Sequence, residues 1–103
     1  MSLLRGEIWH YQNVLNRPGL SSKRLIVSTP AINRAEQLPV VLSLHVYDTD
    51  PGGLLAVALG DQGWTTAMSI EPTMRSRLTA RLAVIEDDTM DLVNAALRTA
   101  LDL

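Results

Sequence analysis

Residues 39–47, PVVLSLHVY, carry the clearest β-strand pattern in the chain. Side chains alternate between the two faces of a strand, so this stretch has one continuous apolar face and one mixed face. The apolar face comprises Val40, Leu42, Leu44 and Val46, and the mixed face comprises Val41, Ser43, His45 and Tyr47. The pattern predicts a strand that packs one side on a core and leaves the other side wetter.

Upstream of this strand the sequence predicts two more strands and a short helical turn. Residues 6–11 and 23–28 are β-type runs, and the loop between them, residues 12–22, contains the turn sequence NRPG. Residues 29–33 fit a helical turn, because Thr29 can cap it and a proline follows at the first helical position.

Downstream, the pattern continues as strands and ends as a helix. Residues 54–59, 64–70 and 78–84 are predicted strands, and residues 72–77 are predicted as a turn. Apolar residues at three- and four-residue spacings predict a helix over residues 87–102, with acidic residues at its positive N-terminus. The expected architecture is therefore mainly β, with about six strands and a C-terminal helix.

Composition limits the classes of protein that the chain can represent. The 103 residues are 47% hydrophobic and 19% charged, which predicts a single domain over residues 1–103 with one core. Nine basic against eleven acidic residues argue against a general basic coat for nucleic acid, so only a local groove could bind one.

The same composition predicts that the protein uses no metal and no cofactor. The chain has no cysteine, and two histidines alone cannot complete a four-coordinate zinc site. No glycine-rich phosphate loop is present. The longest apolar run is far shorter than the ~20 residues that cross a bilayer, and no secretory signal is recognisable, so we expect a cytoplasmic protein without membrane contact.

Several short stretches occur in an order and spacing that resemble one protein family. They are RGEIW at 5–9, LIVS at 25–28, NR at 33–34, the segment 70–78, and AVIEDDTM at 83–90. Together they resemble the MazF/PemK toxins of bacterial toxin-antitoxin pairs over nearly the whole chain.

The resemblance implies a fold, an activity and partners. The fold would be a small, strongly curved sheet, SH3-like or β-barrel-like, with a C-terminal helix. Members similar to this chain are homodimers that cut single-stranded RNA sequence-specifically, and the disordered tail of a cognate antitoxin occupies the RNA groove. The resemblance therefore implies a toxin that, if it is an enzyme, is a metal-independent endoribonuclease.

The family pattern also assigns roles to particular residues. Counted without a gap, the family arginine that opens the second strand matches Ser22, and Arg24 lies two residues later on the same strand face. The catalytic threonine or serine of the family matches His45, and a family basic residue matches Glu71.

Cleavage through the 2′-hydroxyl of RNA needs a proton acceptor, a proton donor and a cation for the phosphate. Arg24 and His45 are therefore the predicted catalytic pair, because arginine binds phosphate and histidine transfers protons near neutral pH. The predicted RNA-binding residues are Arg17, Lys23, Ser22 and Ser43.

Structural alternatives remain open for these residues. His45 could be a half-buried strand histidine that is hydrogen-bonded to Ser43 or Tyr47. Arg24 and its neighbour Lys23 could be charges that protect a strand edge, and Arg17 could be a solvated turn residue.

A second resemblance leaves the type of toxin open as well. Residues 60–64, GDQGW, are similar to a stretch of the CcdB gyrase poisons, which share the fold. That resemblance implies a non-catalytic toxin that binds a protein target such as DNA gyrase.

Overall fold

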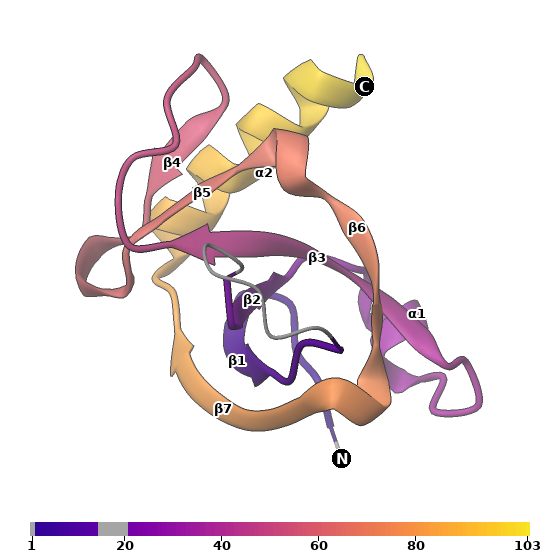
Figure 1. Cartoon of the computed structure of the whole chain (residues 1–103). Coiled ribbons are helices and arrows are strands. Elements are labelled where there is room, and N and C mark those ends of the chain that lie inside the picture. The colour runs from indigo at the N-terminus through magenta and orange to yellow at the C-terminus, as the bar shows by residue number, and fades with distance from the viewer. Residues whose placement is uncertain (1, 15–20) are drawn as a thin grey trace.

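The computed structural model describes residues 2–14 and 21–103, which form a curved antiparallel sheet with a long helix beside it (Figure 1). Within these residues the strands are β1 (Glu7–Tyr11), β2 (Lys23–Ile26), β3 (Val40–Tyr47), β4 (Ala56–Ala58), β5 (Trp64–Thr66), β6 (Glu71–Met74) and β7 (Leu78–Val84). The helices are α1 (Pro30–Arg34) and α2 (Asp87–Leu101), and the 3-10 turns are η1 (Gly60–Gln62), η2 (Ala67–Ser69) and η3 (Arg75–Arg77). The predicted mainly β architecture with a C-terminal helix is confirmed.

Strand β3 is the centre of the sheet, whose order is β4-β5-β3-β2-β1-β7. One edge of β3 pairs with β2, and the other edge pairs with β6 along its first half and with β5 at its end. The 3-10 turn η2 joins β5 to β6, and η3 leads on to β7, which bends around the sheet toward β1 (Figure 1). Every pairing is antiparallel, including that between β1 and β7 from opposite ends of the chain.

Both faces of the sheet carry a hydrophobic core, which corrects the expectation of one buried and one wet face. The larger core is formed by Ile8, Leu25, Val27, Leu44, Val46, Val57, Leu59, Ala67, Ile85, Val93 and Leu97. The smaller core is formed by Leu3, Trp9, Ile26, Val41 and Leu78. Because the sheet is strongly curved, the mixed face of β3 is enclosed as well, and Val41 and Ser43 are buried there.

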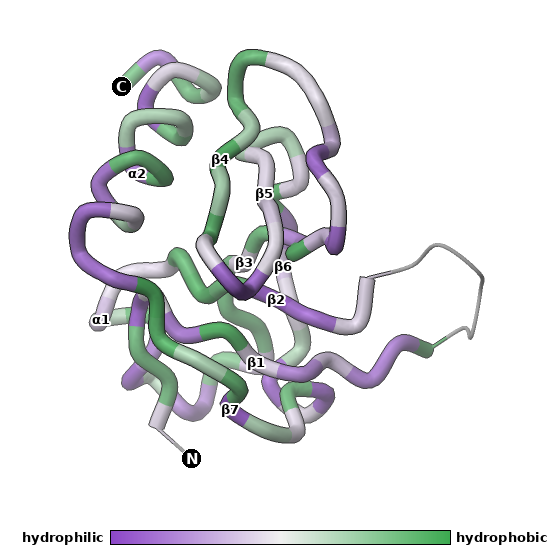
Figure 2. Tube along the Cα trace, turned by 90° about the vertical axis from the view of Figure 1, so that its left-hand side faces the viewer, coloured by the Kyte–Doolittle hydropathy of each residue, from purple (hydrophilic) through white to green (hydrophobic). Residues whose placement is uncertain are grey.

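Helix α2 covers the larger core with its apolar stripe. Val93 and Leu97 are its buried residues, and burying such side chains contributes about 1.5–3 kcal/mol each. Figure 2 shows α2 standing beside β4 and β5. Asp87 and Asp88 lie in its first turn, where the helix dipole favours acids. At α1, the predicted cap is confirmed, since the Thr29 side chain accepts a hydrogen bond from the Ile32 amide at 3.4 Å.

The segment between β4 and β7 differs most from the prediction. The strand predicted at 64–70 ends at Thr66, whose side chain accepts a hydrogen bond from the Met68 amide (3.2 Å) and starts η2. The turn predicted at 72–77 is instead a strand, β6, followed by η3. Pro72 pairs opposite Leu42 on the sheet edge, where a strand tolerates a residue without an amide hydrogen.

Gly63 lets β5 start close to the end of β3. Its φ angle is +108°, and a Cβ atom at this position would lie 2.2 Å from the carbonyl oxygen of Tyr47. Only glycine avoids both the left-handed strain and this backbone clash. The close approach fixes the position of Tyr47, which borders the candidate site.

Candidate functional site

The antiparallel pairing of β2 with β3 brings the two predicted catalytic residues together. Arg24 lies directly opposite His45 in the register. Side chains of directly opposed residues point to the same face of a sheet. Arg24 and His45 are therefore neighbours in space, although they are far apart in the sequence, because the strand register places them side by side.

Arg24 is buried, with 3% of its side chain exposed. Nη1 donates to the carbonyl oxygens of Ser21 (2.7 Å) and Lys23 (3.0 Å), and Nη2 donates to Oδ1 of Asn13 (3.3 Å). Its guanidinium carbon lies 4.4 Å from the ring centroid of Tyr11, a cation–π contact. Burial lowers the pKa of Arg24, an effect that the nearby Glu71 carboxylate opposes. These contacts tie the chain on both sides of the segment 15–20 to the sheet.

His45 is more accessible than Arg24, with 18% of its side chain exposed. Its Nε2 atom lies 2.8 Å from Oε1 of Glu71, and its ring stacks on Tyr47 with centroids 6.1 Å apart and planes at 15°. The backbone amide of His45 donates to Oγ of Ser69 at 3.0 Å. The His45 ring is therefore contacted on one face by Tyr47 and at Nε2 by Glu71, which restricts its orientation.

Glu71 links the two predicted residues. Its Oε1 atom accepts from Nε of Arg24 (3.3 Å) as well as contacting His45, and 39% of its side chain is exposed. It comes from the start of β6, which pairs there with Ser43. In the sequence comparison, Glu71 stood out only because it occupies the position of a basic residue in the family pattern. No local signal identified it as a site residue, since β6 itself was predicted as a turn.

The predicted RNA-binding residues lie in different surroundings. Lys23 is half-buried, and its Nζ donates to the Gln62 carbonyl at 3.4 Å. Ser22 is exposed immediately before β2. Arg17 lies outside the described residues.

Ser43 lies in surroundings that do not favour its predicted contact with RNA. It is completely buried, and its hydroxyl is hydrogen-bonded to that of Thr73 on β6. A hydroxyl without exposed surface has no access to RNA. The polar contact of the His45 ring is with Glu71, at 2.8 Å, rather than with the Ser43 or Tyr47 side chains considered from the sequence.

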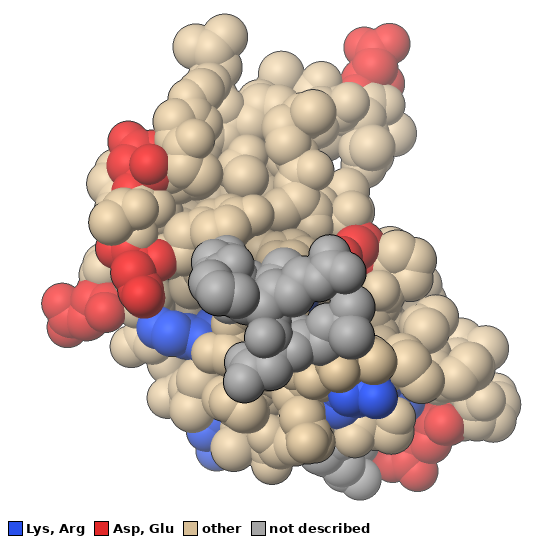
Figure 3. Space-filling model, in the orientation of Figure 1, with Lys and Arg blue, Asp and Glu red and all other residues tan. Residues whose placement is uncertain are grey.

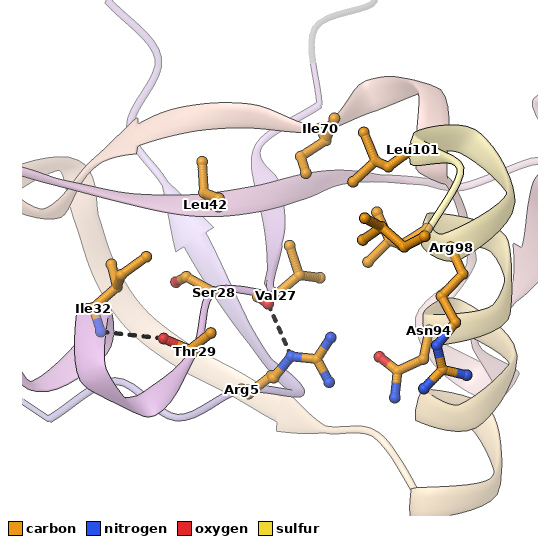
Figure 4. Close-up of a pocket in the computed structure, with 12 residues that line it drawn as sticks. Arg5, Val27, Ser28, Thr29, Ile32, Leu42, Ile70, Asn94, Arg98 and Leu101 are labelled. Atoms are coloured by element: carbon orange, nitrogen blue, oxygen red, sulfur yellow. Dashed lines mark hydrogen bonds between the residues drawn. The ribbon is translucent and has the colours of Figure 1, made fainter.

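A second feature, separate from this cluster, is a cavity of 390 Å³ between the sheet and α2. Figure 4 shows Arg5, Asn94 and Arg98 on one side of it and Leu42, Ile70 and Leu101 on the other. Arg5 donates from Nε to the Val27 carbonyl (2.8 Å), and burial and the nearby Arg98 cation both lower its pKa. The lining contains no carboxylate side chain.

Charge elsewhere on the surface is mixed. Figure 3 shows acidic and basic groups scattered over one face, without a continuous basic coat. Among the described residues, no group of three or more potential ligands is positioned to hold a metal ion. None of the helices in this described part of the chain is long and apolar enough to span a membrane.

No protein-family profile and no curated protein sequence matches the chain. Solved structures do match it over its full length. An endoribonuclease from a mycobacterial species is 28% identical, with a TM-score of 0.82, over 100% of this chain and 94% of that chain. A mycobacterial endoribonuclease in complex with its cognate antitoxin is 29% identical, with a TM-score of 0.83, over 99% and 97% of the two chains. MazF from Deinococcus radiodurans is 19% identical, with a TM-score of 0.79, over 100% and 99%.

The fold and these comparisons define the structural class of the chain. It is a MazF-like fold, which is a mainly antiparallel β-sheet with a C-terminal helix. The full-length structural neighbours are, more narrowly, endoribonuclease toxins of the MazF/PemK family at 19–29% identity. The family resemblance expected from the sequence is thereby confirmed.

Proposed function

We propose that this protein is the toxin of a toxin-antitoxin pair and acts as a sequence-specific endoribonuclease on single-stranded RNA. The supporting observation is the full-length likeness to two mycobacterial endoribonucleases at 28% and 29% identity. The adjacent placement of Arg24 and His45 by the β2–β3 register agrees with this activity, because it joins a cation to a proton-transfer group.

His45 is the proton-transfer residue in this proposal. It accepts the proton of the RNA 2′-hydroxyl, the 2′-oxygen bonds to phosphorus, and the bond from phosphorus to the 5′-oxygen breaks. The 5′-oxygen takes a proton from water, and His45 returns its proton to the solvent. Arg24 supplies positive charge at the base of the site, and the exposed Ser22 lies two residues before it. Lys23, opposite Val46, points to the other face of β2. No metal enters these steps.

The proposed partners are a second copy of the chain and an antitoxin. Large apolar side chains are exposed on several elements, among them Leu82 and Val84 on β7 and Leu103 at the end of the chain. Such surface is typical of protein contacts. One structural neighbour is a complex with its cognate antitoxin. Sedimentation of the purified protein tests the dimer, and a monomer at micromolar concentration contradicts it.

Cleavage of a defined single-stranded RNA by the purified protein in the presence of EDTA tests the activity. His45→Ala should reduce the cleavage rate at least ~100-fold, the usual effect of losing an acid–base group. His10→Ala is the matched control, because His10 is exposed on β1 and bonds only Thr79 among the described residues. Wild-type protein that arrests growth without cutting RNA contradicts the proposal, and rescue by gyrase mutations would then identify a gyrase-binding toxin.

A further inference from the structure

A single carboxylate oxygen organises the candidate site. Oε1 of Glu71 lies 2.8 Å from Nε2 of His45 and 3.3 Å from Nε of Arg24. The Arg24 guanidinium donates a hydrogen bond to this oxygen, which therefore serves as an acceptor. A bare imidazole lone pair would repel a carboxylate oxygen at 2.8 Å, so the hydrogen of the neutral ring belongs on Nε2. In the neutral ring, Nδ1 is then the nitrogen with a free lone pair.

The rest of the surroundings holds the ring in place and leaves Nδ1 available. Tyr47 stacks on the ring, and Ser69 and Thr65 bond the backbone amide and carbonyl of His45 at 3.0 and 2.7 Å. The charged and titratable groups around it are Glu71 from β6, Arg24 from β2, Tyr47 from β3, and Tyr11 from β1 beyond Arg24. Within residues 2–14 and 21–103, no hydrogen bond reaches Nδ1 of His45.

We propose that Glu71 is the positioning residue of the reaction. It fixes His45 as the tautomer with hydrogen on Nε2, directs Nδ1 toward the 2′-hydroxyl of the RNA, and stabilises the imidazolium that forms when Nδ1 takes the proton. This inference rests on the proposed ribonuclease function and adds to it the residue that sets the direction of proton transfer.

The proposal assigns no separate acid and base roles to the two side chains. In an in-line displacement, the attacking 2′-oxygen and the leaving 5′-oxygen lie on opposite sides of phosphorus. Oε1 of Glu71 lies 2.8 Å from Nε2 of His45, too close for the two groups to flank a phosphate from opposite sides. They act as one unit, in which the carboxylate orients the imidazole that contacts the substrate.

This role predicts opposite effects of Glu71 on binding and on turnover. A carboxylate beside the scissile phosphate repels RNA, whereas the same carboxylate supports proton transfer by His45. Glu71→Gln keeps the shape of the side chain and removes the charge. Its kcat should fall at least ~100-fold, while its KM for RNA should stay unchanged or decrease. A residue that only maintains the fold would not separate the two constants in this direction.

The experiment measures kcat and KM on one defined single-stranded RNA for wild type, Glu71→Gln and Glu86→Gln. Glu86 is an exposed glutamate before α2, so its variant makes the same chemical change away from the site and should match wild type. Thermal unfolding of each variant checks that it is folded. Unchanged kcat in a folded Glu71→Gln variant overturns the proposal.

Nitrogen-15 NMR of the His45 ring in the free wild-type protein provides a readout that needs neither RNA nor a variant. At a pH where the ring is neutral, the hydrogen should reside on Nε2, and a hydrogen on Nδ1 overturns the assigned role. If the wild-type protein cuts no RNA, the ribonuclease function fails, and the ring tautomer shows separately whether Glu71 orients His45.

Discussion

Both the Arg24–His45–Glu71 cluster and the cavity beside α2 contain arginines, but the groups that surround the arginine charges differ between the two regions. Arg24 is buried against a carboxylate, two carbonyl oxygens and an aromatic ring. Arg5 and Arg98 share a cavity whose lining has no carboxylate side chain, and burial, followed by the Arg98 cation, lowers the pKa of Arg5. The buried cation of the cluster is therefore compensated by protein groups, whereas the two arginines of the cavity are exposed and solvated by water.

The largest expected effect comes from displacing Tyr47 behind the cluster. Gly63→Ala places a methyl group against the Tyr47 carbonyl at a positive φ angle. We expect a loss of about 3 kcal/mol or more in the free energy of unfolding. Urea denaturation measures it, with Gly53→Ala as the control, because Gly53 also has a positive φ angle but no atom within 4 Å of the added Cβ. Equal losses in both variants would show that the Tyr47 contact is unimportant.

A smaller but still large effect on stability should follow from removing the Arg24 side chain. Arg24→Ala leaves two carbonyl oxygens and the Glu71 carboxylate without their donor, at a cost of about 2 kcal/mol in unfolding free energy, reduced by the partial exposure of Glu71. Cleavage of RNA should fall ~100-fold.

Arg24→Lys is the matched variant for this test. It keeps the positive charge but loses the forked donors, so we expect it to recover part of the stability and little of the cleavage. Urea denaturation and single-turnover RNA cleavage measure the two quantities. A fully stable Arg24→Ala protein would contradict the structural role of this arginine.

The smallest effects are expected in the cavity. Arg98→Ala should change the free energy of unfolding by no more than about 0.5 kcal/mol, since it removes an exposed charge that repels Arg5. Arg98→Glu should also change it little, because an ion pair with Arg5 is worth only a few tenths of a kcal/mol and an acid in the last turn of α2 is disfavoured by the helix dipole to a similar extent. Urea denaturation at low and high salt measures both variants, and the small differences should shrink as salt screens the charges. A loss above about 1 kcal/mol in Arg98→Ala would show that the cavity also depends on its charges.

Much of the site could be predicted from the sequence, but its connecting residue could not. Arg24 and His45 each lie on a strand that the local sequence predicts. The alternation of side chains along each strand also predicts which face of the sheet each residue occupies. The burial of Ser43 and the position of Glu71 were not predicted. Both depend on β6, whose local sequence, with Pro72 near its start, resembles a turn.

The sequence by itself determined the strands and the helix in which apolar residues recur at a regular spacing. β1, β3, β7 and α2 agree with the predicted segments to within a residue at each end, because alternation and helical spacing are properties of a single stretch of chain. Tertiary structure alone decided that β5 and β6 share one edge of β3 and that both faces of the curved sheet are buried. Those features arise from hydrogen bonds and packing between residues far apart in the chain, and β6 is a strand only because β3 offers it a partner.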